Sequence, residues 1–296
     1  MRRHDVDWLR VILFGLLIWF HYAVFSLGTL EGDDSSMEMF NLPLFFIIGV
    51  MHQWRLAALF VISGMGTAFA FRRRIWSVYL KERFSRLGIP LLFGTYILWF
   101  GIFDPLGTTA LLFKLFPGEE DMPYGHLWFI YNLLIYSVLL TPLFSHVRNN
   151  PDGKIVKTIR SLLNVRYGMG LLLLPPLVLS LSNVLFKPWG FGEVGMWWEF
   201  PRYMLYFLFG FLMIVAKEDY FAAIDRIRIP VTVITPVLSL IWFISGEMFS
   251  TPLIYEGGWV AEGYNAFAIE PTIAALIQSF HCLLYTSDAA DEWRSV

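Results

Sequence analysis

The chain has 296 residues, of which 57% are hydrophobic, 18% are aromatic and only 16% are charged, and its mean hydropathy is +0.58. Soluble domains carry about 25% charged residues and disordered chains are poor in hydrophobic ones, so this composition excludes both classes. The formal net charge of −2 gives no support for a nucleic-acid partner, which requires a basic surface. The single cysteine excludes a disulfide framework and a cysteine metal site. We therefore expect a membrane protein in contact with the lipid bilayer.

Eight segments approach or reach the roughly 17–25 apolar residues that cross a bilayer as a helix. They cover residues 8–30, 56–71, 87–103, 127–145, 167–186, 203–216, 229–246 and 263–281. The apolar stretch 39–54 is interrupted by Pro43, Gly49 and His52, so we expect a re-entrant or interfacial piece there. Segment 8–30 is too long and too bulky for a signal peptide. The predicted fold class is all-α, a polytopic transmembrane helical bundle with about eight spans.

The distribution of basic residues orients this bundle. With the N-terminus in the cytoplasm, the inner segments hold 17 Lys and Arg residues and the outer segments hold four, which are Arg55, Lys114, Lys187 and Arg202. Cytoplasmic loops of membrane proteins carry an excess of Lys and Arg, so we predict a cytoplasmic N-terminus. Arg55 begins the second span from the outer side, where its long side chain can snorkel to the interface.

The first span carries two ionisable side chains, Arg10 and His21, which are costly at membrane depth and mark candidate functional sites. Eleven residues of helix make just over three turns, so both lie on one face, about 16 Å apart, with Asp7 on the same stripe. Histidine accepts and returns a proton near neutral pH, which suits the deprotonation of a hydroxyl nucleophile. A structural histidine that hydrogen-bonds a neighbouring helix is the other interpretation. No His, Asp or Glu cluster has metal-ligand spacing, so we expect no metal.

Three further polar features follow along the chain. Arg83 and Arg86 share a helix face at i and i+3, and arginine pairs bind phosphate through planar forks; the other interpretation is that they only set the topology. Ser63 and Gly64 form a small-residue notch that favours close helix packing, and Ser63 is also a candidate to line a cavity. His126 heads the fourth span and is a candidate for the outer mouth of that cavity.

Four segments in order carry a resemblance to one family. They read RRHDVDWLRVILFGLLIWFHYAVF, QWRLAALFVISGMGTAFAFRRR, LKERFSRLGIPLLFGTYILWF and GHLWFIYNLLIYSVLL. Together they resemble the membrane acyltransferase-3 family, near its branch of periplasmic-glucan succinyltransferases, strongly over 2–145 and more weakly over 146–281. The resemblance implies about ten membrane helices in a multi-pass protein of the bacterial inner membrane. It also implies transfer of an acyl group, acetyl or succinyl, from acyl-CoA to a hydroxyl of a carbohydrate or glycan acceptor in the cell envelope, as in O-acetylation.

The resemblance also implies roles for individual residues. Arg10 and His21 match the family's first-helix arginine and histidine with the same gap, and Arg83 and Arg86 match its Arg-x-x-Arg pair. His21 is then the general base or a transient acyl carrier, assisted by Arg10. Arg83 and Arg86 bind the phosphates of acyl-CoA, which is a co-substrate and not a permanently bound cofactor.

The chain has two helices fewer than the resemblance implies, and CLLYTSDAADE from Cys282 onward resembles a translated transposase adaptor. We therefore expect an acyltransferase-3-like transmembrane domain over 1–281 and a non-native tail over 282–296; a native polar tail is the other interpretation. A secondary transporter or sugar-lipid flippase is the alternative function, since buried His and Arg also mark substrate pathways. Such transporters show internal repeats or paired broken helices, and the sequence shows no repeat. A non-catalytic scaffold leaves the Arg10 and His21 stripe without a role.

Overall fold

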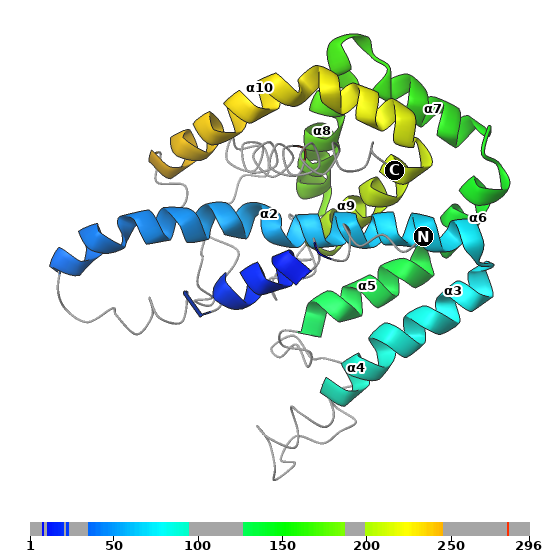
Figure 1. Cartoon of the computed structure of the whole chain (residues 1–296), viewed down its shortest axis with the longest axis horizontal. Coiled ribbons are helices and arrows are strands. Elements are labelled where there is room, and N and C mark those ends of the chain that lie inside the picture. The colour runs from blue at the N-terminus through cyan, green and yellow to red at the C-terminus, as the bar shows by residue number, and fades with distance from the viewer. Residues whose placement is uncertain are drawn as a thin grey trace.

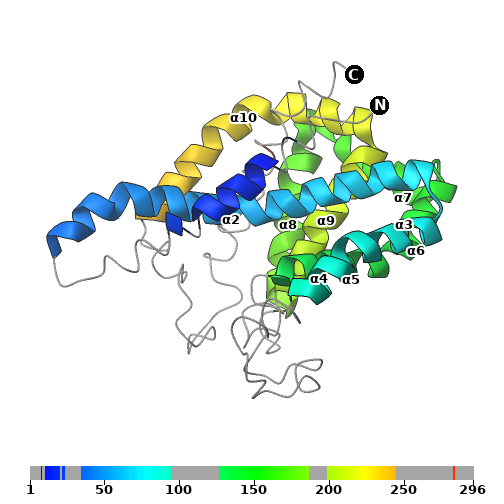
Figure 2. The same ribbon diagram turned by 60° about the horizontal axis from the view of Figure 1, so that its bottom comes forward.

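The computed structural model of the protein describes residues 8, 11–20, 22–23, 35–94, 127–186, 199–244 and 283. Within them the regular structure is entirely helical, which confirms the predicted all-α class (Figure 1). A first helix, Val11–Phe20, precedes the other elements. These are α2 (Ser35–Arg73), α3 (Trp76–Arg83), a π-helical turn (Phe84–Gly88), α4 (Ile89–Leu92), α5 (Trp128–Leu139), α6 (Thr141–Asn149), α7 (Lys154–Leu163), a 3-10 turn (Arg166–Gly168), α8 (Met169–Phe186), α9 (Glu199–Val215) and α10 (Lys217–Ile244). Both views place α10 and α3–α5 on opposite sides of α2 (Figures 1 and 2).

Three helical units, α2, α5–α6 and α9, form a core in which all of them run in the same direction. At one end the Phe60 ring lies 4.7 Å from Phe129 and 4.8 Å from Tyr203, between ring centroids. At the other end the Phe144 ring stacks on Phe211 at 4.0 Å. The predicted topology requires this parallel arrangement, because the second, fourth and sixth spans all run from the outside to the cytoplasm.

We call the first of these ends the aromatic end, defined by Phe60, Trp128, Phe129 and Tyr203. The opposite one is the basic end, defined by Arg72, Arg148 and Lys217, where α2, α6 and α9 finish. The first helix runs antiparallel to α2, as alternate spans must. Its Phe14 ring packs against Phe129, the neighbour of Phe60 in α2, whereas its later Phe20 ring packs on Arg55, which precedes Phe60.

Two glycines let α2 and α9 approach until their backbones touch. A Cβ atom added at Gly64 would lie 1.9 Å from the carbonyl oxygen of Phe207, and one added at Gly210 would lie 1.9 Å from that of Val61. Any side chain here would therefore push the helices apart. This confirms the prediction that the small residues of the second span serve close packing.

The length of α2 corrects one prediction. α2 is one continuous helix of 39 residues, whereas the sequence predicted a separate re-entrant or interfacial piece over 39–54. The predicted break is wrong, because a proline removes one intrahelical hydrogen bond without ending a long helix whose other turns are intact. α8 likewise continues through Pro175 and Pro176. The part of α2 apolar enough to cross a bilayer begins at Trp54, so an interfacial position for 39–54 stays a prediction. Arg55 therefore lies in the interior of a longer helix, near the start of its apolar span Trp54–Arg73, as the sequence predicted.

The described residues hold between one and three candidate membrane spans. Trp54–Arg73 is the one described helix long and apolar enough to cross a bilayer, and two bent helix pairs raise the number to three if each pair is one span. The predicted count of eight stays a prediction.

The outward face of α8 carries Leu173, Leu177, Leu181 and Leu185, each more than half exposed. A continuous exposed leucine row is unfavourable in water and is typical of a surface that contacts lipid.

A sharp bend joins α7 to α8, whose axes lie 86° apart. Tyr167 and Gly168 at the bend have positive φ angles of 59° and 72°, and a Cβ at Gly168 would lie 2.6 Å from the Ile227 side chain. α7 buries Val156 and exposes Lys157 on its other face. A short helix with one apolar and one basic face, turned across its neighbour, is typical of a segment lying along a membrane surface.

Candidate functional site

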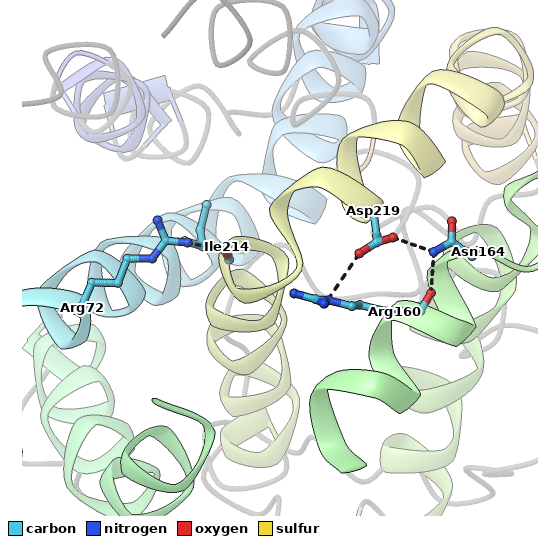
Figure 3. A network of polar contacts seen from close by, with 5 residues as sticks. All are labelled: Arg72, Arg160, Asn164, Ile214 and Asp219. Carbon is cyan, nitrogen blue, oxygen red and sulfur yellow. Dashed lines mark hydrogen bonds and ion pairs between the residues drawn. The ribbon is translucent and has the colours of Figure 1, made fainter. Parts of the chain in front are cut away.

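Arginines close the basic end of the core. Arg72 donates a hydrogen bond from Nη2 to the carbonyl oxygen of Ile214 at 3.1 Å (Figure 3), and Arg148 donates from Nη1 to that of Arg74 at 2.7 Å. The last carbonyls of a helix lack intrahelical partners, and a cation is favourable beside them. These bonds therefore fasten the ends of α9 and α2 to the core.

A second polar network anchors α7 at the start of α10. The side-chain amide of Asn164 donates to Oδ1 of Asp219 at 2.6 Å, and Nε of Arg160 lies 3.5 Å from Oδ2 of the same carboxylate (Figure 3). Asp219 lies in the first turn of α10, where a negative charge is favourable. The network holds the surface helix α7 against the bundle.

Arg83, a predicted donor-binding residue, is held against α2 at this end of the molecule. Its Nη2 donates to the Thr67 hydroxyl at 2.9 Å, and that hydroxyl lies 3.2 Å from the hydroxyl of Tyr79. The guanidinium carbon also lies 5.1 Å from the centre of the Tyr79 ring. Thr67 and Tyr79 are buried, while Arg83 is half-buried. Because a guanidinium has five N–H donors, this contact orients Arg83 and leaves capacity to bind an anion.

Arg86 lies in a different local geometry from the predicted one. It is exposed and belongs to the π-helical turn Phe84–Gly88, whereas Arg83 ends α3. A π turn has wider i to i+5 hydrogen bonding than an α-helix, so the backbone between the two arginines differs from the regular α-helix that the sequence predicted. Such turns occur frequently at functional sites. The pairing of Arg83 and Arg86 on one ligand stays a prediction.

The remaining predicted site residues divide into one that is described and four that are not. The Ser63 hydroxyl is half-buried and donates to the carbonyl oxygen of Leu59 at 2.7 Å, and Thr67 donates to the carbonyl oxygen of Ser63. Ser63 and Arg83 are thus linked through Thr67, which the sequence analysis did not single out. Asp7, Arg10, His21 and His126 lie outside the described residues.

Arg55 is the functional candidate that sequence reasoning missed. It does not snorkel: it is 1% exposed, and its guanidinium carbon lies 3.9 Å from the centre of the Phe20 ring. Two of its nitrogens, Nε and Nη1, are buried without a hydrogen-bond partner among the described residues. The signal was helical spacing, because Arg55, Leu59 and Ile62 fall on one face and all three are buried.

A cluster of aromatic rings lies at the aromatic end. Phe60 is its centre, with Phe129 and Tyr203 as close neighbours, and the Trp128 ring lies 5.4 Å from that of Tyr203. Arg202, which precedes Tyr203 on α9, is also buried, at 6% exposed. The two described cations of the predicted outer segments, Arg55 and Arg202, are therefore both inside the bundle.

The bundle thus combines a polar arginine network at one end, a buried arginine that stacks on Phe20 toward the other, and a leucine-rich outer face on α8. The chain belongs to the family described as "Acyltransferase domain", whose profile matches residues 3–289. This confirms the resemblance found in the sequence, and members of this family are membrane proteins.

Among curated proteins the chain is similar to glucans biosynthesis protein C. It is 28% identical over 162 residues to that protein of Shigella dysenteriae serotype 1 (strain Sd197), and 27% identical over 162 residues to that of Escherichia coli (strain K12). Each alignment covers 51% of this chain and 41% of the relative. The chain thus spans about two fifths of the length of the curated relatives it matches. No solved structure matches the chain.

Proposed function

We propose that this protein is an integral-membrane acyltransferase that moves an acyl group, of acetyl or succinyl type, from acyl-CoA to a hydroxyl of a carbohydrate or glycan. The observation that carries the proposal is the family match over residues 3–289. The curated relatives are named for glucan biosynthesis, which supports a carbohydrate acceptor. The proposed location is the bacterial inner membrane, with a cytoplasmic N-terminus and the basic end facing the cytoplasm.

In this proposal the donor binds at the basic end. Arg83 is held by Thr67 and Tyr79, so its planar fork is oriented before the ligand arrives, and Arg86 lies three residues further on an exposed turn. Pre-oriented arginines bind phosphate groups with two parallel hydrogen bonds. The phosphates of acyl-CoA fit this chemistry, and the acyl thioester then extends along the bundle.

The transfer step is assigned to His21, with Arg10 assisting. His21 removes the proton of the acceptor hydroxyl, whose oxygen attacks the thioester carbonyl carbon. The new C–O bond forms as the C–S bond breaks, and the leaving CoA sulfur takes the proton back from His21. The support from the structure is that the first helix belongs to the core: Phe20, which precedes His21, packs on Arg55, and Leu13 is fully buried.

A transporter or sugar-lipid flippase is the second candidate. The observation in its favour is the pair of bent helix units, at 47° between α5 and α6 and at 86° between α7 and α8. Transporters commonly place their substrate where helices are broken. The family match gives the acyltransferase the stronger support.

The test uses the full-length protein in lipid nanodiscs with acetyl-CoA or succinyl-CoA as donor and a glucan oligosaccharide as acceptor. We expect acceptor-dependent CoA release and a matching mass increase of the oligosaccharide. Arg226→Gln, which changes an exposed arginine of α10, is the matched control and should keep the wild-type rate. Accumulation of labelled oligosaccharide in proteoliposomes, without CoA release, would contradict the enzyme and support the transporter.

A further inference from the structure

An apolar pocket lies between the surface helix α7 and the helices α8 and α9. It holds about 550 Å³ of empty space, within the roughly 300–1,000 Å³ of most ligand pockets. Its walls include Leu162 of α7, Leu174 of α8 and Met213 of α9. Of the described residues that line it, Tyr220 of α10 is the one with a polar side-chain group. Such walls offer a sugar or a charged ligand almost no hydrogen bonds, whereas a hydrocarbon chain gains free energy by leaving water for them.

The pocket adjoins the surface that is typical of lipid contact. Leu162, which lines the pocket, is 37% exposed, and Ile155, two helical turns earlier on the same side of α7, is equally exposed. On α8 the lining residue Leu174 directly follows Leu173, the first leucine of the exposed row. An acyl chain that lies along α8 therefore reaches the pocket without crossing a polar surface.

A basic turn lies at one end of this pocket. Arg166 and Tyr167 belong to the turn between α7 and α8, and the residues on its two sides, Leu163 and Gly170, both line the pocket. Nη2 of Arg166 donates to the Tyr167 hydroxyl at 2.9 Å, and the guanidinium carbon lies 4.8 Å from the centre of the Tyr167 ring. Both side chains are exposed. Because a guanidinium has five N–H donors, the contact orients Arg166 and leaves capacity to bind a phosphate.

The charge of α7 favours a lipid with a net negative charge. The helix carries Lys154, Lys157 and Arg160 and no acidic residue. Both lysines are exposed, whereas Arg160 is paired with Asp219 (Figure 3). Basic segments at a membrane surface are attracted to anionic lipids. A zwitterionic headgroup brings its own cation, which the two lysines repel.

We propose that the pocket binds an acyl chain of an anionic phospholipid, in the leaflet on which α7 lies, with the lipid phosphate on Arg166. This inference goes beyond the proposed function and does not depend on acyl transfer. It gives a role to the backbone of Tyr167, since a φ of 59° is uncommon for a bulky residue and costs free energy. The bound chain fills space beside Met213, on the side of α9 opposite the contact of Gly210 with α2. The lipid should therefore stabilise the bundle.

The test compares the full chain in nanodiscs of phosphatidylcholine alone with the same chain in nanodiscs that also contain phosphatidylglycerol. A ligand that binds the folded state raises the melting temperature, so the wild type should melt higher with phosphatidylglycerol. Titration of the lipid into detergent micelles gives the apparent Kd. Arg166→Gln should raise this Kd about tenfold, the effect of losing a charged hydrogen bond. Arg73→Gln, which changes an exposed arginine at the end of α2, is the matched control and should keep the wild-type Kd.

A bulky substitution tests the pocket separately from the headgroup. Leu174→Trp places a large ring where the acyl chain binds and should abolish the increase in melting temperature that phosphatidylglycerol causes. Leu177→Trp is the matched control, because Leu177 lies on the same helix, is exposed and is outside the pocket lining. A full increase in Leu174→Trp, or equal losses in both variants, would overturn the pocket as the site of the chain.

Three further outcomes would overturn the proposal. Equal melting temperatures of the wild type with and without phosphatidylglycerol would do so even if the variants do not fold. Equal losses of affinity in Arg166→Gln and Arg73→Gln would indicate a general attraction of basic residues to the membrane surface. An equal increase in melting temperature with sodium oleate would assign the pocket to a free fatty acid. These measurements need no acyl transfer, so their outcome is independent of that of the proposed enzyme.

Discussion

Replacing Gly64 by alanine should destabilise the bundle, because the added methyl group meets backbone and not a movable side chain. Its Cβ would lie 1.9 Å from the carbonyl oxygen and 2.9 Å from the carbonyl carbon of Phe207, and 3.0 Å from the amide nitrogen of Phe211. Relief requires α2 and α9 to separate by roughly 1 Å, and a gap of 0.5–1 Å forfeits about a quarter to a half of the dispersion energy of the contacts involved.

The expected cost follows from two opposing effects. Overpacking a filled core costs about 1–3 kcal/mol, and a clash with helix backbone belongs at the upper part of that range. Alanine regains up to about 1 kcal/mol of helix propensity over glycine. We therefore expect Gly64→Ala to lower the free energy of unfolding by about 2 kcal/mol. Gly210→Ala should behave similarly, because its Cβ would lie 1.9 Å from the carbonyl oxygen of Val61.

The assay is unfolding by sodium dodecyl sulfate in mixed micelles, followed by tryptophan fluorescence. Gly15→Ala is the matched control: no atom lies within 4 Å of its added Cβ, so it should be neutral or slightly stabilising. The double variant Gly64→Ala with Gly210→Ala should cost less than the sum, because one separation relieves both clashes. Wild-type stability of Gly64→Ala, within about 0.5 kcal/mol, would refute the close backbone contact of α2 and α9.

Three further predictions concern topology and chemistry. A reporter fused after Pro151 should be cytoplasmic and one fused after Glu119 exported, as the distribution of basic residues requires; phosphatase and fluorescence activities measure this, and both on one side would contradict it. His21→Gln should lower acyl transfer by about two to four orders of magnitude at normal membrane levels, since an amide cannot accept the proton; substantial activity would defeat the mechanism. Arg83→Lys should raise the KM for acyl-CoA about tenfold through loss of the planar fork, and Thr67→Val should raise it less; steady-state kinetics with unchanged KM values would return Arg83 to a topology role.

Several features of this protein follow from the sequence alone because their physical causes are local. A composition that is 57% hydrophobic predicts segments inside a membrane, where no water is available to the backbone N–H and C=O groups. A helix pairs these groups within one segment, so the composition also predicts helices. The order of four motifs indicated the family that the match over 3–289 confirms. The Ser63–Gly64 notch predicted close packing, since a missing side chain is visible in one segment whatever its partner is.

Other features depended on which segments meet, and only the tertiary structure decided them. Pro43 and Gly49 indicated a break, yet α2 continues through them. Arg55 has the sequence context of a snorkelling arginine, but Phe20 lies 3.9 Å from it and buries it. Arg83 and Arg86 have α-helical spacing, but Arg86 lies in a π turn, and a hydrogen bond to Thr67 of α2 fixes where Arg83 lies. The physical reason is shared: the exposure and orientation of a side chain are set by contacts with helices far away in the chain, and a local pattern does not specify that partner.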